Sequence, residues 1–277
     1  MITDKKHVSK LISYWLRHHP EAAGLVLDEF GWSDISCLLN ELKAKGYELT
    51  VNDIVILNQS FDKVRWAFNE MGNKIRATHG HSVNIVIEEN PITPPDILYH
   101  GTAIKFLEHI IMGGLKAMSR QFVHLSSNPA VALQVGDRHG KSILIKIDAQ
   151  ALHNDGHIFY NTSDNVWLTK VVPDVYLQFG QWHRLNYDKM HFLQKELNNE
   201  VGLRHTLYSR LQTLEPLMRR YDRDDCLFID KKDNSVHIVH LTWNNENYYS
   251  DIYPNTVSYV NLAKWLSTDF LEDYEFE

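Results

Sequence analysis

The stretch HVSKLISYWLRHHP, residues 7–20, determines how the fold begins. Its apolar side chains recur at the three- and four-residue spacing of one helix face, and they are Val8, Leu11, Ile12, Trp15 and Leu16. Pro20 disfavours helix at the residue before it, so the helix is predicted to stop at Arg17-His18-His19. These cationic side chains then lie at a helix carboxyl end, where the helix dipole favours positive charge.

Residues 1–92 are predicted to form one small lobe. Helical patterns run from Ser33 to Lys45, with Ser33 as the cap and Gly46 as the stop, and from Val51 to Gln59. Two short strands, 63–68 and 74–77, flank a turn around Gly72. Helices followed by a hairpin are typical of a winged-helix-like unit. Three prolines, Pro91, Pro94 and Pro95, mark the end of this lobe.

Residues 93–180 are predicted to form a compact, β-rich α+β lobe. Short apolar runs indicate strands at 97–100, 122–125, 142–147, 158–160 and 166–168. Helical patterns at 103–112 and 128–139 interrupt them. The expected fold class is therefore α+β, with the two lobes divided near residue 92.

Residues 187–277 are predicted to form a separate small α+β appendage, after a linker at 178–186. The pattern is mostly helical over 187–220, then indicates strands at 226–229 and 236–243 and a closing helix at 259–267. The segments RDDCLF (223–228) and VHLTW (239–243) resemble a short, uncharacterised bacterial domain. A structural or oligomerising module is one interpretation. A surface that modulates access to RNA or recruits a partner is the other.

Composition excludes several classes of protein. The 277 residues hold no apolar run long enough to span a membrane and begin with a polar segment, so a cytoplasmic protein is expected. The two cysteines, Cys37 and Cys226, lack the spacing of a disulfide framework or a zinc site, and no metal is expected. Residues 1–180 hold 17 Lys+Arg against 19 Asp+Glu (net −2) and residues 181–277 hold 11 against 16 (net −5), so the net charge of −7 lies mainly in the last third. Such a charge suits recognition of one phosphate better than coating of a long nucleic acid.

Several short motifs stand out along the first two thirds of the chain. They are LRHHPE (16–21), KVR (63–65), IRA (75–77), GHS (80–82), LYHGT (98–102), MSRQFVHLS (118–126) and GDRHG (136–140). Each by itself is typical of an ordinary strand end or charged helix end. In this order and spacing, over about residues 5–178, they resemble the RNA 2'-phosphotransferase family. Its members use NAD to remove the 2'-phosphate that tRNA splicing leaves.

The resemblance implies a catalytic tetrad of Arg17, His18, Arg65 and Arg120. Arg17 and Arg65 are expected to clamp the RNA phosphate, because planar guanidinium groups bind phosphate bidentately. His18 and Arg120 are expected to stabilise charge or move a proton when the phosphate is released from RNA.

The resemblance also implies an ADP-ribosyltransferase-like lobe that binds NAD as a co-substrate. The residues expected to contact NAD are His100, Gly101, Thr102, His124, Leu125 and Ser126. The apolar segment 166–169 occupies the position where many other transferases carry a catalytic glutamate, which argues against ordinary protein ADP-ribosylation. Phe122 and Asp164-Asn165 depart from the residues usual at these places in the family.

Four further residues are expected to contact the RNA, namely Arg76, His81, Ser82 and Arg138. For Arg76 and Arg138, a plain ion pair with a nearby carboxylate is an equal alternative. Truncation after Phe179 is expected to leave a soluble, active protein.

By this resemblance, the RNA phosphate displaces nicotinamide from NAD. A ribose hydroxyl then attacks the phosphorus, which gives RNA with a free 2'-hydroxyl and ADP-ribose 1'',2''-cyclic phosphate. Two alternatives stay open: a transferase that leaves ADP-ribose on a terminal nucleic-acid phosphate, and a non-catalytic protein that binds RNA ends. The expected partners are RNA bearing a 2'-phosphate and NAD, with no membrane; protein partners are left open.

Overall fold

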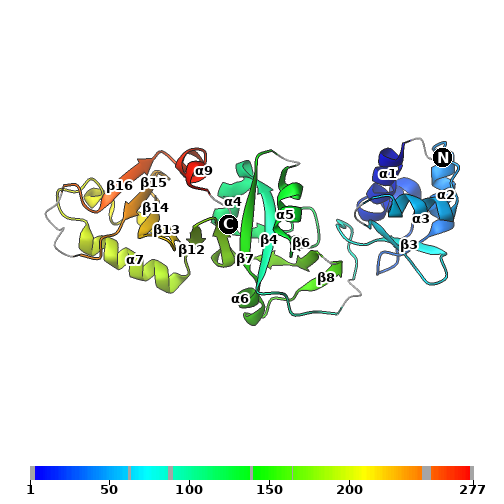
Figure 1. Cartoon of the computed structure of the whole chain (residues 1–277), viewed down its shortest axis with the longest axis horizontal. Helices are drawn as coiled ribbons and strands as arrows, with labels where there is room; N and C mark the ends of the chain where they lie inside the picture. The colour runs from blue at the N-terminus through cyan, green and yellow to red at the C-terminus, as the bar shows by residue number, and fades with distance from the viewer. Residues whose placement is uncertain are drawn as a thin grey trace. The chain divides into compact units, whose positions relative to one another are not determined.

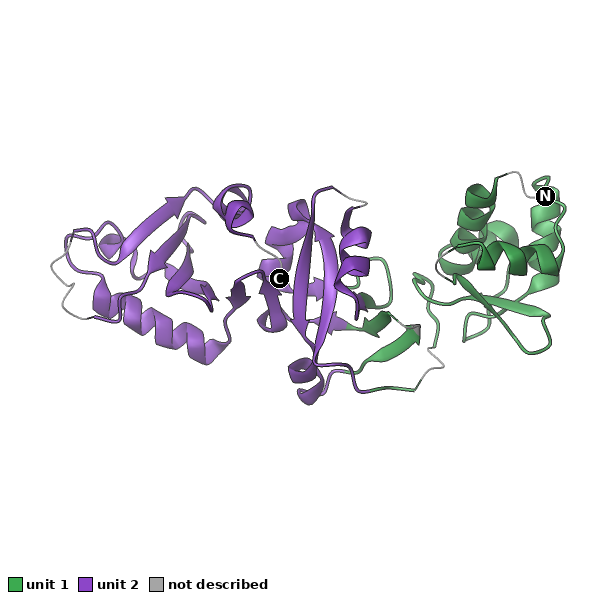
Figure 2. Cartoon of the chain, viewed as in Figure 1, with its two compact units in different colours: residues 1–92, 116–124, 158–170 green, residues 93–115, 125–157, 171–277 purple. Residues whose placement is uncertain are grey.

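The computed structural model describes residues 4–61, 64–86, 90–137, 140–163, 165–244 and 251–274. Helices and strands are mixed along the chain, which confirms the α+β class (Figure 1). The chain divides into two compact units, coloured separately in Figure 2. Unit 1 comprises Met1–Ile92, Lys116–His124 and Ile158–Lys170, and unit 2 comprises Thr93–Leu115, Leu125–His157 and Val171–Glu277. No helix of the described residues has the length and apolar character needed to cross a membrane.

Unit 1 begins with helices and a small sheet. Its elements are α1 (Lys5–Arg17), a 3-10 turn (Pro20–Ala23), β1 (Ser33–Asp34), α2 (Ile35–Ala44), α3 (Val51–Gln59), β2 (Trp66–Phe68) and β3 (Lys74–Ala77), then β8 (Tyr160–Ser163) and β9 (Val166–Thr169). The predicted first helix, third helix and hairpin are confirmed, with β2 and β3 antiparallel and Trp66 opposite Ala77. The proline stop also holds, since α1 ends at Arg17 and Pro20 opens the 3-10 turn.

The predicted cap of the second helix is wrong by one residue. Asp34, not Ser33, caps α2, because its carboxylate accepts a hydrogen bond from the Ser36 amide at 2.7 Å. Ser33 instead belongs to β1, where it pairs with Ile75 of β3. Both residue types are good caps, so the choice between them depends on the tertiary pairing of Ser33.

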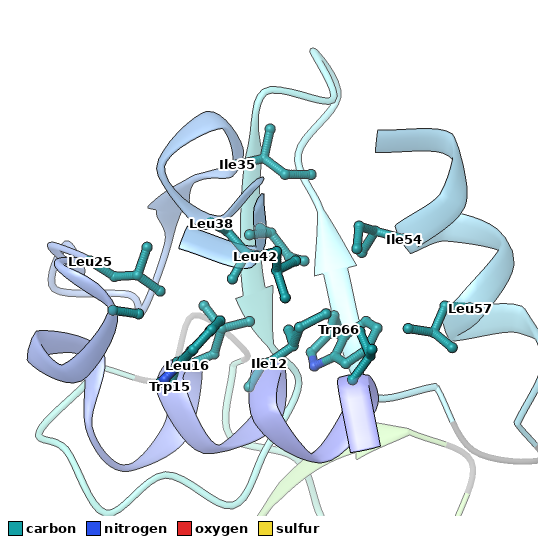
Figure 3. Packing of buried hydrophobic residues seen from close by; sticks show 14 residues of the cluster. Ile12, Trp15, Leu16, Leu25, Ile35, Leu38, Leu42, Ile54, Leu57 and Trp66 are labelled. Atoms are coloured by element: carbon teal, nitrogen blue, oxygen red, sulfur yellow. The ribbon is translucent and has the colours of Figure 1, made fainter. Parts of the chain in front are cut away.

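A single apolar core holds the helices of unit 1 to the β2–β3 hairpin (Figure 3). Side chains from α1, α2 and α3 converge on Trp66, whose ring is fully buried. The labelled core residues are Ile12, Trp15, Leu16, Leu25, Ile35, Leu38, Leu42, Ile54, Leu57 and Trp66. This packing fixes the last turn of α1, so the Arg17 backbone has one position relative to the hairpin.

Unit 2 is built on an antiparallel sheet with the strand order β16-β15-β14-β13-β12-β11-β7-β4. The strand bounds are β4 (Ile97–Ala103), β7 (Ser142–Asp148), β11 (Leu177–Phe179), β12 (Trp182–Arg184), β13 (Leu214–Arg220), β14 (Asp225–Asp230), β15 (Val236–His240) and β16 (Asn255–Tyr259). Its helices are α4 (Leu107–Gly113), α5 (Pro129–Gly136), α6 (Ala149–Asn154), α7 (Tyr187–Glu200), α8 (Leu262–Leu266) and α9 (Asp269–Asp273). Short strands also occur at β5 (Leu115–Lys116), β6 (Val123–Ser126) and β10 (Val171–Val172), with 3-10 turns at Ile104–Phe106, Asp174–Tyr176 and Tyr208–Arg210.

The predicted linker at 178–186 is wrong. These residues form most of the β11–β12 hairpin, in which Phe179 pairs with Trp182. β12 then pairs with β13, so the sheet continues without a break into the C-terminal part. The physical reason is that Trp182 alternates with polar residues, and a short alternating stretch forms a strand once a partner strand satisfies its backbone.

The helical prediction for 187–220 is correct only as far as Glu200. Leu214, Leu217 and Met218 have a spacing that also suits a helix, which explains the error. In the structure they lie in β13, and Pro216 falls where the register with β14 shifts. A bulge tolerates proline, whereas a helix interior does not.

Tyr274, which follows α9, is hydrogen-bonded to the middle of the sheet of unit 2. The Tyr274 hydroxyl donates to the Leu144 carbonyl at 2.8 Å and accepts from the Leu144 amide at 3.0 Å. Leu144 lies in β7 directly opposite Gly101 of β4. Trp265 of α8 packs edge-on against Trp182 at 5.2 Å between ring centres. The C-terminal part is therefore continuous with the strands that hold the predicted NAD residues.

Candidate active site

Arg17 lies among two other arginines in unit 1. Burial first, and then the positive charges of Arg65 and Arg120, together lower the pKa of Arg17 to about 10. Its Nη2 donates weakly to the Arg65 carbonyl at 3.5 Å. Its Nε is buried and has no hydrogen-bond partner among the described residues. A buried donor among like charges is a place where an anion would bind with large effect.

Neighbouring elements hold Arg65 in place. Its Nη1 donates to the Ser9 hydroxyl of α1 at 2.7 Å, and its amide donates to the Asn58 side chain of α3 at 2.9 Å. Its guanidinium also lies over the Phe61 ring, 4.1 Å from the centre. Neither Ser9 nor Asn58 was predicted in this role. Ser9 stands out only as a polar residue on the apolar face of α1, where it is fully buried.

His18 is oriented by Ser82. A hydrogen bond of 3.0 Å joins His18 Nδ1 to Ser82 Oγ, and the Ser82 amide donates to the Arg17 carbonyl at 2.9 Å. Gly80 has φ +86°, a conformation that favours glycine, and it turns this loop back toward α1. The pKa of His18 is lowered by burial first, then by the charges of Arg17 and Arg120. The predicted residues Arg17, His18 and Ser82 are thus brought together.

Gln121 ties the Arg120 segment to the loop after β3. Its amide donates to the His81 carbonyl at 3.1 Å. Its side chain donates to Asn84 Oδ1 at 2.7 Å and to the Ile85 carbonyl at 3.2 Å. These three bonds place Arg120 near the end of α1. Gln121 was not predicted as a site residue, and its position beside Arg120 is the only signal in the sequence.

A small pocket, with a volume of about 30 Å³, lies in unit 1 near these arginines. Three of its lining side chains are the histidines His79, His81 and His124, and Phe30 and Phe122 supply aromatic walls. The His79 and His124 rings meet edge to face, with 5.7 Å between centres. His79 was missed by sequence reasoning, although it directly precedes the predicted Gly80-His81-Ser82 motif.

Burial and positive charge keep two of these histidines neutral. Burial first, and then the charges of Arg17 and His79, together lower the pKa of His81 to about 3. The pKa of His124 is also lowered to about 3, by burial first and then by Arg120 and His79, although a hydrogen bond to the Phe122 carbonyl opposes the shift. The pocket therefore carries a positive potential that comes from arginine and not from protonated imidazole.

The low pKa values of His81 and His124 predict that the protein loses stability as pH falls. Above pH 6.5 both rings are neutral in the folded and unfolded chains, so they have no differential effect. Between pH 6.5 and about 3 only the unfolded chain takes up the protons, which costs about 1.4 kcal/mol per pH unit for each histidine. We expect urea unfolding at pH 7.5, 6.5 and 5.5 to give decreasing free energies. The double change His81→Gln and His124→Gln should flatten this dependence, whereas His109→Gln, at an exposed histidine, should not. A slope unchanged in the double variant would contradict the prediction.

Two other predicted positions differ in how far the structure describes them. The Arg76 guanidinium lies over the Trp32 ring, 4.6 Å from its centre, and Arg76 lines the pocket. Arg138 lies outside the described residues.

Phe122, which departs from the family's usual residue, packs against Tyr160. The Lys170 ammonium lies over the Phe122 ring, 4.0 Å from its centre.

The remaining predicted NAD residues belong to unit 2. His100, Gly101 and Thr102 lie in β4, and Ser126 of β6 pairs with Tyr99. A Cβ on Gly101 would lie 1.8 Å from the Ala132 carbonyl oxygen, so the glycine lets α5 pack on this strand. His100 and Thr102 point to the opposite face, because side chains alternate along a strand.

Leu125 and Ser126 have local structural roles. Leu125 is buried, so it can contact a ligand only through its backbone. The Ser126 hydroxyl donates to the Asn128 carbonyl and accepts from the Asn128 amide, which shapes the start of α5. Trp167, Leu168 and Thr169 of β9 are buried, in the segment that lacks the glutamate of other transferases. No group of three metal-binding side chains occurs in the described ranges.

The cluster of arginine and histidine side chains in unit 1 is suited to bind phosphate groups, as in proteins that transfer or hydrolyse them. Comparison with known proteins makes this specific. Residues 3–171 match the family described as RNA 2'-phosphotransferase, Tpt1 / KptA family. The chain therefore belongs to the RNA 2'-phosphotransferase family, which is a family of transferase enzymes.

Individual relatives agree with the family assignment. A protein of Hahella chejuensis named "Probable RNA 2'-phosphotransferase" is 42% identical over 172 residues, which are 62% of this chain and 92% of the relative. Proteins of the same name from Agrobacterium fabrum and Pseudomonas aeruginosa are each 45% identical, over 169 and 166 residues. These alignments cover 61% and 60% of this chain and 91% of each relative. The C-terminal part thus lies beyond the matched family region.

Proposed function

We propose that this enzyme transfers an internal 2'-phosphate from RNA to NAD, giving RNA with a 2'-hydroxyl, nicotinamide and ADP-ribose 1'',2''-cyclic phosphate. The observation that carries the proposal is the surroundings of Arg17. Two further guanidinium groups lower its pKa, and its buried Nε has no partner among the described residues. A phosphate dianion would accept this hydrogen bond and would relieve the repulsion among the three cations.

The residues of unit 1 suit distinct roles in this reaction. Arg17 and Arg65 clamp the phosphate. Ser9 holds the Arg65 guanidinium, and Asn58 holds the Arg65 backbone amide, before the substrate arrives. Such preorganisation lowers the cost of stabilising charge in the transition state. Arg76, His81 and Ser82 contact the RNA around the phosphate. In this interpretation the first lobe is winged-helix-like and presents the end of α1 to the RNA.

His18 is suited to proton transfer. Its Nδ1 is held by Ser82, which leaves Nε2 to face the reacting groups. Nearby arginines lower its pKa in the free enzyme. A bound dianion would raise that pKa, so protonated His18 becomes available when the phosphate is in place. Arg120 stabilises the charge that develops on the non-bridging oxygens.

NAD supplies an electrophilic ribose carbon and a leaving group, nicotinamide. His100 and Thr102 share one face of β4, and an imidazole with a hydroxyl suits the hydroxyl groups of a nucleoside. This donor set fits NAD, with His124, Leu125 and Ser126 as further contacts and Gly101 offering its backbone. The lobe of β4 and β7 is in this proposal ADP-ribosyltransferase-like. Both cysteines are free thiols, which is consistent with the cytosolic location that we propose.

The test is incubation of the full chain with a short RNA carrying one internal 2'-phosphate, with and without NAD. RNA is resolved by gel electrophoresis and small molecules by mass spectrometry. We expect NAD-dependent loss of the phosphate together with ADP-ribose cyclic phosphate. Persistent ADP-ribosylated RNA would instead indicate the one-step transferase. No reaction with this RNA or with a terminally phosphorylated one would leave the RNA-end binder.

A further inference from the structure

An exposed cluster of aromatic and cationic side chains lies in the C-terminal part, beyond the matched residues 3–171. Phe192 of α7 and Trp243, which follows β15, stack nearly parallel at 22° with 6.0 Å between ring centres. The Arg219 guanidinium of β13 lies over Trp243, 5.1 Å from its centre. Phe192 is 55% exposed and Trp243 is 39% exposed. We call these three residues the aromatic platform.

The backbone beneath Trp243 is specifically supported. Trp243 has φ +55°, a conformation that is costly for a bulky residue. The Glu200 carboxylate accepts from the Trp243 amide at 2.7 Å, the Thr242 amide at 2.8 Å and the Thr242 hydroxyl at 2.8 Å. Glu200 itself has no exposed surface. A fully buried carboxylate that holds a strained backbone keeps the half-exposed tryptophan ring in one orientation.

Positive charge borders the platform, although residues 181–277 as a whole are acidic. His183 of β12 lies opposite Arg219 of β13 in the sheet. Its pKa is lowered by burial first, then by the charges of Lys189 and Arg219, so both cations lie close to it. Asp224 pairs with Arg219 at 3.0 Å and offsets part of this charge. Arg219 and Lys189 thus supply positive charge beside the platform, and Asp224 reduces it.

We infer that the aromatic platform binds single-stranded RNA by stacking one unpaired base on the outer face of Phe192, whose other face is backed by Trp243, with Arg219 and Lys189 near the phosphate of that nucleotide. This inference rests on RNA as the substrate of the proposed reaction. Stacking on aromatic rings tolerates any base, and cations beside the ring add to it. RNA is preferred to a protein partner because a cation lies over the exposed rings and RNA is the substrate of the proposed reaction. The platform gives the chain a second contact with the RNA, separate from the 2'-phosphate.

The test measures binding of the full chain to a labelled 12-nucleotide single-stranded RNA that carries no 2'-phosphate, by fluorescence anisotropy without NAD. Stacking of one base on aromatic rings corresponds to a change in Kd of about fivefold or more, so Phe192→Ala and Arg219→Gln should each weaken binding by at least that factor. Tyr187→Ala is the matched control, because Tyr187 lies on the same helix and is 82% exposed, with no contact to the platform among the described interactions. Its affinity should stay unchanged. Melting curves establish that each variant is folded.

Folded Phe192→Ala and Arg219→Gln variants with wild-type affinity would overturn the inference and leave the cluster as a structural or protein-contact surface. Equal losses in Tyr187→Ala would overturn it as well. The proposed transfer is tested separately with a 2'-phosphorylated trinucleotide, on which Phe192→Ala should keep wild-type turnover. Arg17→Ala should lose that turnover while it keeps affinity for the unmodified RNA. An enzyme that fails at transfer but depends on Phe192 for RNA binding would refute the proposed function and retain the platform.

Discussion

Replacement of Arg120 by alanine is expected to let ADP-ribosylated RNA accumulate, because release of the RNA slows more than the transfer that precedes it. In the proposed reaction, negative charge grows on the non-bridging phosphate oxygens during release, and Arg120 is one of the cations whose field reaches Arg17, His18 and His124. Loss of one such group slows a reaction by about 10²- to 10³-fold. The release step should slow by that order, with nicotinamide formation less affected.

The measurement follows both steps in a single turnover, with nicotinamide and RNA species sampled over the same time course. Arg204→Ala is a suitable control, since Arg204 is an exposed arginine of the C-terminal part. It should release RNA at the wild-type rate. Complete turnover by Arg120→Ala without any intermediate would remove Arg120 from the role assigned to it.

Truncation after Phe179 is expected to destabilise unit 2 strongly, contrary to the expectation from sequence. The cut removes β12 and leaves β11 as an open sheet edge, which promotes aggregation. It also removes Trp265 and Tyr274, so the two hydrogen bonds between the Tyr274 hydroxyl and the Leu144 backbone are lost. A loss of about 3 kcal/mol corresponds to a fall of roughly 10 °C in Tm for a chain of this size. Differential scanning calorimetry and solubility at equal concentration provide the measurement.

Tyr274→Phe separates the hydrogen bonds from the rest of this contact. The Leu144 amide and carbonyl each lose their hydrogen bond to the Tyr274 hydroxyl, whereas the aromatic ring at position 274 still packs against Phe270. Each lost bond costs about 1 kcal/mol, so Tm should fall by a few degrees. A truncated protein that is soluble, active and unchanged in Tm would show that the C-terminal part makes no contribution to the stability of the remaining strands of unit 2.

Local patterns predicted many of the elements well. The stripe of α1, the proline stop after His19 and the hairpin around Gly72 all depend on interactions between residues near in sequence. The strands β14 and β15 were also recognisable from their apolar runs. Errors occurred where one pattern suits two structures. Leu214, Leu217 and Met218 fit a helix as well as a strand, and only the pairing of β13 with β12 and β14 decides between them.

The residues of the candidate site likewise fall into those that the sequence predicted and those that only the structure revealed. Motif order was sufficient to nominate Arg17, His18, Arg65 and Arg120, and the structure places these residues in one unit, while their catalytic roles stay predictions. Ser9, Asn58, His79 and Gln121 were not found, because their contributions depend on contacts formed by folding, which for Ser9, His79 and Gln121 join residues far apart in sequence. Ser9 and Arg65, for example, are 56 positions apart and meet only when α1 packs on the hairpin.

The sequence by itself thus determined the α+β class, the first helices and the family to which the chain belongs, since these depend on short-range periodicity and motif spacing. Only the tertiary structure decided that the sheet runs unbroken from β4 to β16, that Tyr274 returns to Leu144, and that Trp243 stacks on Phe192. The physical reason is that strand pairing and side-chain packing join distant residues. The free energy of these contacts depends on which backbone groups and apolar surfaces find partners in the folded chain. A local sequence pattern does not contain that information.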